Sequence, residues 1–114
     1  MNSNDSLLIL GSAGILVTII GLVSYRWPAK KINSWHGYRT TFSMKSQEIW
    51  DYAQPLASKA IIIGGVVLIL TGLFFELIPG KIVFTPTVQA IFISFALIIP
   101  LAFVDNRLRK KFPS

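Results

Sequence analysis

The sequence contains no cysteine and a single histidine, His36. Without cysteine the chain has no disulfides and no thiolate ligands. A lone histidine is weak evidence for a metal site, so we expect no metal, no cofactor and no catalytic residues. Charge is scarce as well, because Asp, Glu, Lys and Arg make up 14% of the residues, against roughly 25% in average soluble proteins. This composition is unlike that of an ordinary soluble domain.

The few charges leave three long stretches uncharged: residues 6–25, 60–75 and 82–104. A helix needs about 20 mostly apolar residues to cross a hydrocarbon core of about 30 Å. We therefore predict an all-α integral membrane protein with three transmembrane helices. The expected spans are about 7–25, 60–78 and 87–104, in a single domain over 1–114.

The first apolar run is predicted to be a retained membrane helix. No Lys or Arg stands before it, and SYRWPAKK, which follows it, offers no small-x-small cleavage site. Both features differ from those of a cleaved secretory signal peptide.

The basic residues indicate the orientation. Ten of the eleven Lys and Arg lie after the first span or in the C-terminal tail: Arg26, Lys30, Lys31, Arg39, Lys45, Lys59, Arg107, Arg109, Lys110 and Lys111. The remaining one, Lys81, lies in the short loop between the second and third spans. Because positive loops stay cytoplasmic, we predict a multi-pass protein of the cell membrane. Its N-terminus is expected outside, and its first loop and C-terminus in the cytoplasm.

The net charge of +6 has a plain explanation in this setting. Basic clusters beside membrane helices attract anionic lipid headgroups, which we expect as partners. Nucleic-acid binding is not expected, because the basic residues are divided between two sites beside helix ends and form no long stripe.

Small residues recur within the spans at helical spacing. Gly14, Thr18 and Gly21 fall on one face of the first span, and Ala60 and Gly64 are four residues apart in the second. Small residues let membrane helices approach closely. They predict a three-helix bundle that packs on itself, while the oligomeric state is left open.

The polar loop over residues 26–57 holds the residues best suited to specific recognition of a partner. All three tryptophans and all three tyrosines lie in or beside it. Within it, Ser43 is expected to cap a short helix that runs to about Gln54 and ends at Pro55. Phe42, Ile49 and nearby apolar residues recur at spacings of three, four and seven. This periodicity predicts an interfacial amphipathic helix in the first, cytoplasmic loop.

Two residues of the loop have specific expected roles. Gly37 permits a backbone turn that a side chain would obstruct. Arg39 has a guanidinium that can hold either a lipid phosphate or a carboxylate of Glu48 or Asp51. The first alternative is ligand capture, and the second is an intramolecular clasp that fixes the loop.

The motif N-x3-G-Y-R-T-x2-S-M-K-x2-E-x-W resembles the signature of the SdpI family of small membrane proteins. The positions that carry the resemblance are Asn33, Gly37, Tyr38, Arg39, Thr40, Ser43, Met44, Lys45, Glu48, Trp50 and Ala53. Ser46 and Gln54 depart from it, because many members have Asn at these two positions. The founding member also has additional membrane segments upstream.

This family is named for immunity to a secreted sporulation-delaying peptide toxin. The resemblance implies toxin immunity or signal transduction at the cell membrane, with a peptide toxin and a cytoplasmic regulator as partners. The motif residues Asn33, Gly37, Tyr38, Arg39, Thr40, Ser43, Glu48 and Trp50 are the expected binding residues. We therefore expect a binding protein and not an enzyme.

Two other functions are weighed against this one. The chain can be read as a small structural or accessory subunit of a membrane complex. It can also be read as a membrane enzyme that uses His36 with Glu48 and Asp51 for acid–base or metal chemistry. The second alternative is the weaker one, since His36 lies outside the shared motif and no nucleophile–base pair or phosphate loop is present.

The basic asymmetry makes the topology testable with reporter fusions. A reporter that works only in the cytoplasm should be active when it is fused after Ser114. A reporter that works only after export should be active when it is inserted near Gly80. The opposite pattern would overturn the predicted orientation.

Overall fold

The computed structural model, which describes residues 3–33, 37–77 and 86–112, consists of three α-helices and a folded loop. The helices are α1 (Ser3–Arg26), α2 (Gln47–Leu77) and α3 (Pro86–Lys111), and no strand occurs in those ranges. Three segments are long and apolar enough to cross a membrane: Leu8–Arg26, Gln47–Leu77 and Thr87–Lys111. The predicted all-α architecture, with three helices long and apolar enough to span a membrane, is confirmed in the part of the chain that the structure describes.

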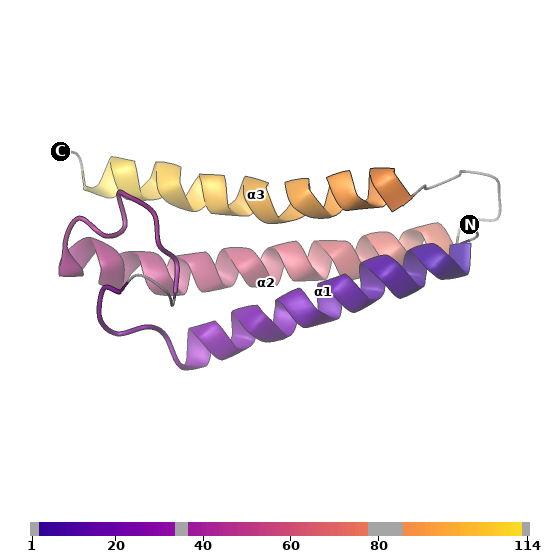
Figure 1. Cartoon of the computed structure of the whole chain (residues 1–114), viewed down its shortest axis with the longest axis horizontal. Coiled ribbons are helices and arrows are strands. Elements are labelled where there is room, and N and C mark those ends of the chain that lie inside the picture. The colour runs from indigo at the N-terminus through magenta and orange to yellow at the C-terminus, as the bar shows by residue number, and fades with distance from the viewer. Residues whose placement is uncertain (1–2, 34–36, 78–85, 113–114) are drawn as a thin grey trace.

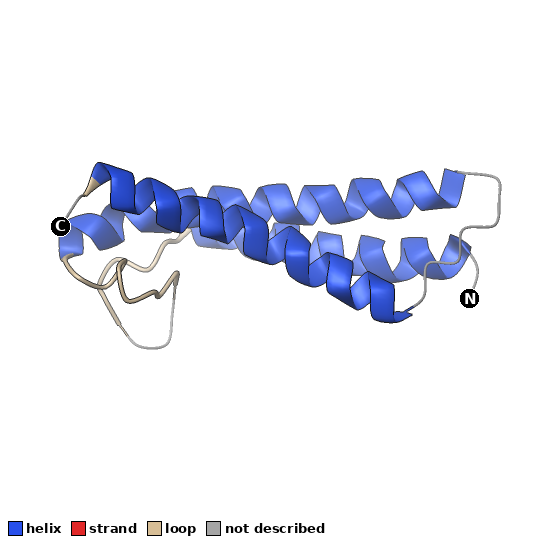
Figure 2. Cartoon of the chain, turned by 90° about the horizontal axis from the view of Figure 1, so that it is seen from above, coloured by secondary structure: helices blue, strands red, loops and turns tan. Residues whose placement is uncertain are grey.

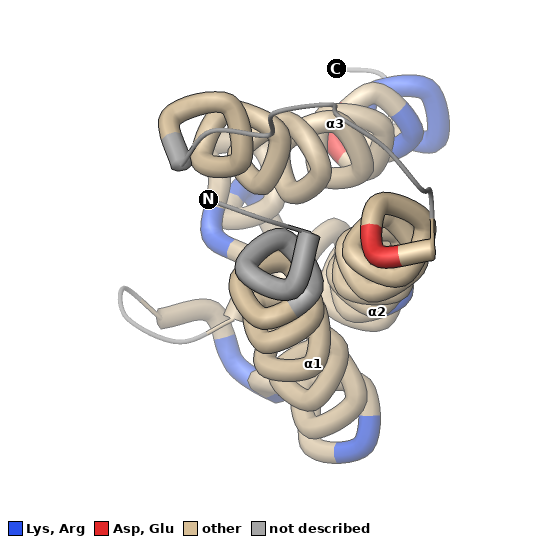
Figure 3. Tube along the Cα trace, turned by 90° about the vertical axis from the view of Figure 1, so that its right-hand side faces the viewer, with Lys and Arg blue, Asp and Glu red and all other residues tan. Residues whose placement is uncertain are grey.

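The helix α2 is the centre of the bundle. Figure 1 shows α1 and α3 on either side of it, and Figure 2, seen from above, shows α3 passing obliquely over the other two helices. Both outer helices pack against α2, whereas α1 and α3 barely touch each other. The loop and the C-terminal end of α3 lie at one end of the bundle, and the start of α1 lies at the other. Lys and Arg gather around the loop end, as Figure 3 shows.

The length of α2 explains why its first turns stand apart from the others. At 1.5 Å per residue its 31 residues extend about 46 Å, which exceeds the roughly 30 Å of a hydrocarbon core. The excess lies at the loop end, where the first turn of α2 carries Glu48. The polar end of the bundle thus consists of the first turns of α2 as well as the loop.

The prediction that a separate helix ends at Pro55 is wrong. Residues 47–54 are instead the first turns of a continuous α2 that contains Pro55. An interior proline removes one helical hydrogen bond and crowds the preceding turn. Here both flanking turns are held by packing, because Trp50 and Ala53 before the proline and Ala57 after it are all buried. Tertiary contacts therefore outweigh the local preference to stop.

A close crossing of α1 and α2 is centred on two glycines. A Cβ atom on Gly65 would lie 2.7 Å from the backbone nitrogen of Thr18 and 2.9 Å from the carbonyl oxygen of Gly14. A Cβ atom on Gly14 would in turn lie 2.7 Å from the Gly65 oxygen. The Thr18 hydroxyl donates to the Gly14 carbonyl at 2.7 Å, so its polar group is satisfied within α1. The small-residue face predicted on the first span is confirmed as a contact within the bundle.

The contact of α2 with α3 involves Gly64 and Ala96. A Cβ atom on Gly64 would lie 2.8 Å from the Ala96 carbonyl oxygen. Pro100 is four residues after Ala96 and has no N–H to donate to that carbonyl. The Ala96 carbonyl therefore receives no hydrogen bond from Pro100. The same carbonyl approaches the backbone of α2 at Gly64.

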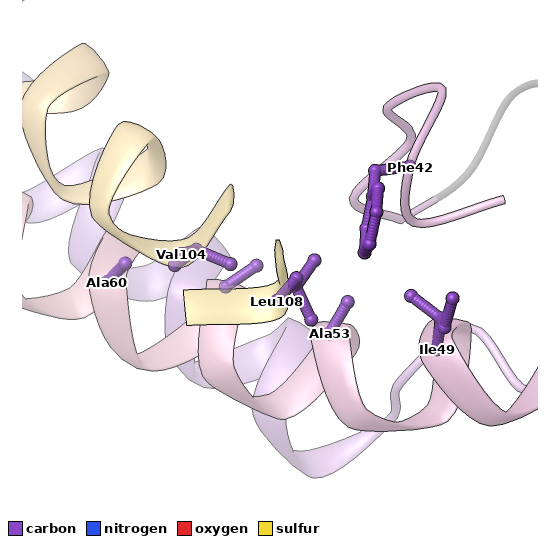
Figure 4. Packing of buried hydrophobic residues seen from close by; sticks show 7 residues of the cluster. Phe42, Ile49, Ala53, Ala60, Val104 and Leu108 are labelled. Carbon is purple, nitrogen blue, oxygen red and sulfur yellow. The ribbon is translucent and has the colours of Figure 1, made fainter. Parts of the chain in front are cut away.

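The buried apolar cluster lies at the loop end and not at the middle of the bundle. It brings one loop residue together with residues of α2 and α3: Phe42, Ile49, Ala53, Ala57, Ala60, Val104 and Leu108. Figure 4 shows the Phe42 ring directed from the loop toward the helices. Farther along the bundle, large apolar side chains such as Phe95 and Leu70 are exposed, as suits a surface in contact with lipid. The loop is thus part of the core.

Substituting Gly65 tests the α1–α2 crossing. We expect Gly65→Ala to destabilise the protein by about 1–3 kcal/mol, because the new methyl group overlaps backbone atoms that cannot yield easily. Reversible unfolding in mixed detergent micelles, followed by circular dichroism, measures this loss. The neighbouring substitution Val66→Ala is a matched control on the exposed face of α2 and should cost less. Equal stability of the Gly65 variant and wild type would contradict the close crossing.

Candidate functional site

The motif loop is held on α2 by a paired hydrogen bond between Tyr38 and Gln54. The Tyr38 backbone N–H donates to Gln54 Oε1 at 2.8 Å. Gln54 Nε2 donates back to the Tyr38 carbonyl oxygen at 2.9 Å. One side-chain amide therefore satisfies both backbone groups of a loop residue, as a neighbouring β-strand would. Gln54 itself is only 5% exposed, so these bonds are protected from competing water.

Gly37 is required directly before this pair. Its φ of 94° lies in the left-handed region that favours glycine. A Cβ atom there would lie 2.7 Å from Gln54 Oε1 and 2.9 Å from Ala29 Cβ. The predicted need for glycine at this turn is confirmed.

The next turn is closed by reciprocal bonds between Thr40 and Ser43. The Thr40 backbone N–H donates to Ser43 Oγ at 2.8 Å, and the Ser43 N–H donates to Thr40 Oγ1 at 3.0 Å. Ser43 is fully buried, and its hydroxyl lies 3.1 Å from the carbonyl oxygens of both Tyr38 and Thr40. The polar residues of the motif thus bond mainly to one another and to backbone.

The prediction that Ser43 caps a helix is wrong. The cap of α2 is Ser46, whose Oγ accepts from the Ile49 N–H at 3.2 Å. A serine three residues before a free helical N–H is the usual N-cap geometry. Ser43 is instead committed to the preceding turn, so its hydroxyl is not available to α2.

Trp50 anchors the start of the loop from inside the protein. It is fully buried, and its Nε1–H donates to the Ala29 carbonyl oxygen at 2.7 Å. The indole is therefore held inside the protein and is not presented to lipid headgroups. Its ring packs against the chain because Gly37 leaves room for it, with the ring edge 3.3 Å from the position of a Cβ there.

Gln47 adds a second link between α2 and the chain that follows α1. Its Nε2 donates to the Lys30 carbonyl oxygen and to Asp51 Oδ1, each at 2.7 Å. Together with the Trp50 bond, this contact fixes residues 29–30 against the first turns of α2.

The Phe42 ring is contacted by two basic side chains, one from the loop and one from α3. Lys45 Nζ lies 4.8 Å from its ring centroid and Arg109 Cζ lies 5.0 Å from it. Both distances are typical of cation–π contacts. Arg109 also pairs with Asp105 through Nε at 2.9 Å. The loop is thereby joined to α3 as well as to α2.

The remaining predicted residues have mixed outcomes. Asn33 Nδ2 donates to the Lys31 carbonyl oxygen at 2.9 Å. Arg39 and Glu48 are exposed, and the clasp from Arg39 to Glu48 or Asp51 stays a prediction. His36 lies outside the described residues, so the enzyme constellation with Glu48 and Asp51 stays untested. Within the described ranges, no three His, Asp or Glu side chains come together as metal ligands would.

A groove runs between α1 and α3 and ends beneath the loop. Its volume is about 960 Å³. Ile20 and Ser24 of α1 and Ile98 and Ala102 of α3 line its two sides, and Ser58 of α2 lies at its base. The loop end of the groove is lined by Tyr38, Arg39, Thr40, Asp105 and Arg109. The groove exists because α1 slants away from α3 toward the loop end, as Figures 1 and 3 both show.

Tyr38 is the titratable group that this environment perturbs. Burial raises the pKa of its phenol, and the nearby negative charge of Asp105 raises the pKa further. The charged form is disfavoured both by desolvation and by like charge. Tyr38 therefore stays a neutral hydroxyl at the polar end of the groove.

Comparison with known proteins identifies the family. The model of the SdpI/YfhL protein family matches residues 30–104, which include the whole motif, all of α2 and most of α3. The chain belongs to this family. The uncharacterized protein YfhL of Bacillus subtilis (strain 168) is 32% identical over 96 residues, covering 84% of this chain and 82% of that protein. No solved structure gives a significant match.

For this SdpI/YfhL family member, the structure adds residues that the motif did not reveal. Gln54 is the chief one, because the sequence marked it only as a helix end and as a departure from the family pattern. A signal was present: an amide stands between Ala53 and Ala57 on an otherwise apolar face. Ala29, Asp105 and Arg109 could not be found from the sequence, since their roles depend on contacts between distant segments.

Replacing Gln54 tests the loop clamp. Gln54→Leu would leave the Tyr38 N–H buried without a partner, which costs about 1–3 kcal/mol. The Tyr38 carbonyl would keep only the Ser43 hydroxyl as a donor. We expect the Tyr38 amide to exchange hydrogen at least about tenfold faster than in wild type. Exchange measured by mass spectrometry with peptide-level resolution provides the readout. Gln47→Leu is the matched control, because it removes an exposed amide from the same helix and should leave Tyr38 protected. Unchanged exchange in the Gln54 variant would contradict the clamp.

Proposed function

We propose that this SdpI/YfhL family protein protects the cell against a membrane-active peptide toxin, or signals its presence, by binding and not by catalysis. Family membership supports the role, since the resemblance implies immunity or sensing. The observation that carries it is the construction of the motif. Its residues build a rigid, internally bonded loop at the end of an open groove, which is an arrangement suited to recognition.

The proposal includes a location and an orientation. The protein is a multi-pass protein of the cell membrane, with the loop and the C-terminus in the cytoplasm and the N-terminus outside. The basic residues around the loop end meet the anionic lipid headgroups of the inner leaflet. The first turns of α2 lie in that interfacial layer, where Glu48 and Asp51 face water.

The partners follow from this location. A peptide toxin would approach through the membrane, and a cytoplasmic regulator would approach the loop. Exposed motif residues such as Arg39 lie at the inner surface, where either partner would approach. Buried residues such as Ser43 and Trp50 act indirectly, because they hold the loop in shape.

A protection assay tests the proposal. Expression of the protein in a sensitive host should preserve growth in the presence of the peptide. Protection should saturate with the amount of protein, because each copy holds one target and does not turn over. Mass spectrometry of the recovered peptide should find it intact. Cleaved peptide, together with loss of protection in His36→Ala, would overturn binding in favour of catalysis.

Variants of the loop sharpen this assay. We expect Asn33→Ala, Arg39→Ala and Trp50→Ala to abolish protection, and Arg39→Lys to reduce it sharply because lysine lacks the bidentate fork. Trp50→Phe should lose less than Trp50→Ala, since it keeps a six-membered aromatic ring in the buried site and loses the bond to Ala29 and part of the indole volume. Arg107→Ala is the matched control, because it removes an exposed basic residue at the same end of the bundle outside the loop. Membrane levels of each variant are measured alongside growth. Full protection by Arg39→Ala would contradict the role of the motif.

A further inference from the structure

The groove between α1 and α3 changes character along its length. One part is lined by the isoleucines Ile20, Ile61 and Ile98, and the other by Arg39, Asp105, Arg109 and neutral hydroxyl groups. Ile98 and Arg109 are 11 residues apart on one helix, which corresponds to about 16 Å. That distance is about half of a roughly 30 Å hydrocarbon core, or the depth of one leaflet. The groove thus runs from a charged end to an apolar end over the length of a lipid chain.

The groove is open to the bilayer at its sides. Ile20 is 48% exposed and Ile98 is 60% exposed. A molecule already in the membrane could therefore enter between α1 and α3 without crossing water.

We propose that this groove binds one anionic phospholipid. The phosphate lies near Arg109 and Arg39, and an acyl chain lies along the isoleucines. The proposal concerns a resident lipid and stands independently of any role in toxin protection.

Arg109 is the residue best prepared for the phosphate. Its Nε is bonded to Asp105, and its guanidinium lies over the Phe42 ring. These two contacts orient the group while using only one of its five N–H donors, so the terminal nitrogens can bind a second anion. The charged residues that line this end of the groove are Arg39, Arg109 and Asp105, so its net charge is one positive charge.

The size of the groove suits a small occupant. Its volume of about 960 Å³ lies in the range of small-molecule sites. A lipid headgroup with one acyl chain matches both this size and the change from charged to apolar lining along the groove.

Native mass spectrometry of the full chain tests the proposal. The protein is purified in detergent and mixed with equal amounts of dioleoyl phosphatidylglycerol and dioleoyl phosphatidylcholine. We expect one phosphatidylglycerol to be retained per chain in preference to phosphatidylcholine. Equal retention of both lipids, or of neither, would overturn the proposal. So would an adduct with the mass of a second copy or of a co-purified peptide.

Two pairs of variants locate the lipid. Arg109→Gln should weaken phosphatidylglycerol retention about tenfold, as expected for loss of one charge-assisted contact. Arg107→Gln removes the same charge from α3 outside the groove and should have little effect. Ala102→Phe should block the groove sterically, whereas Ala90→Phe places the same side chain on an exposed position of α3 outside it.

Circular dichroism of each variant establishes that the helices are intact. Equal effects of the two arginine variants, or of the two phenylalanine variants, would reduce the interaction to general attraction between a basic surface and anionic lipid. The experiment contains no toxin, so its failure would leave the proposed protective function standing, and the failure of protection would leave the lipid site standing.

Discussion

The paired hydrogen bond between the Gln54 side chain and the Tyr38 backbone is the contact on which the loop end of the molecule depends. A loop that packs onto a membrane helix must bury backbone N–H and carbonyl groups, and each must find a partner. Gln54 supplies both partners from one buried side chain. Gly37 makes the approach sterically possible, and Trp50 holds the preceding segment through Ala29. With these groups satisfied, Phe42 can enter the apolar cluster shared by α2 and α3.

The three helices pack closely at the centre of the bundle, and α1 and α3 are separated at the loop end. Glycines bring α1 and α2 together at the crossing of Gly14 and Gly65, and Gly64 admits the backbone of α3. Beyond the crossing α1 slants away from α3 (Figure 1), and the loop fills only the end of the space between them. Helices in lipid gain little from hiding apolar surface, so they need not close along their whole length. The groove is the consequence.

Charged and aromatic groups tie the same end together. Arg109 reaches from α3 to Phe42 of the loop, and Lys111 lies 5.2 Å from the Tyr52 ring of α2. The Phe112 ring meets Tyr52 edge-on with a centroid distance of 5.7 Å. Individually these exposed contacts are weak, of the order of 0.5–1 kcal/mol each. Their common effect is to set the loop and the end of α3 in one relative position, which defines the charged end of the groove.

The sequence by itself determined the helical class, the three apolar spans, the small-residue crossing and the glycine turn, because each depends on local composition or spacing. The tertiary structure decided the rest. It continued α2 through Pro55 since packing on both sides outweighed a local helix breaker, and it gave the cap to Ser46 because Ser43 had become part of a buried turn. It also placed Trp50 inside the protein and gave Gln54 its role, since both depend on a loop returning over residues distant in the chain. Only that return creates partners for a buried indole and a buried amide.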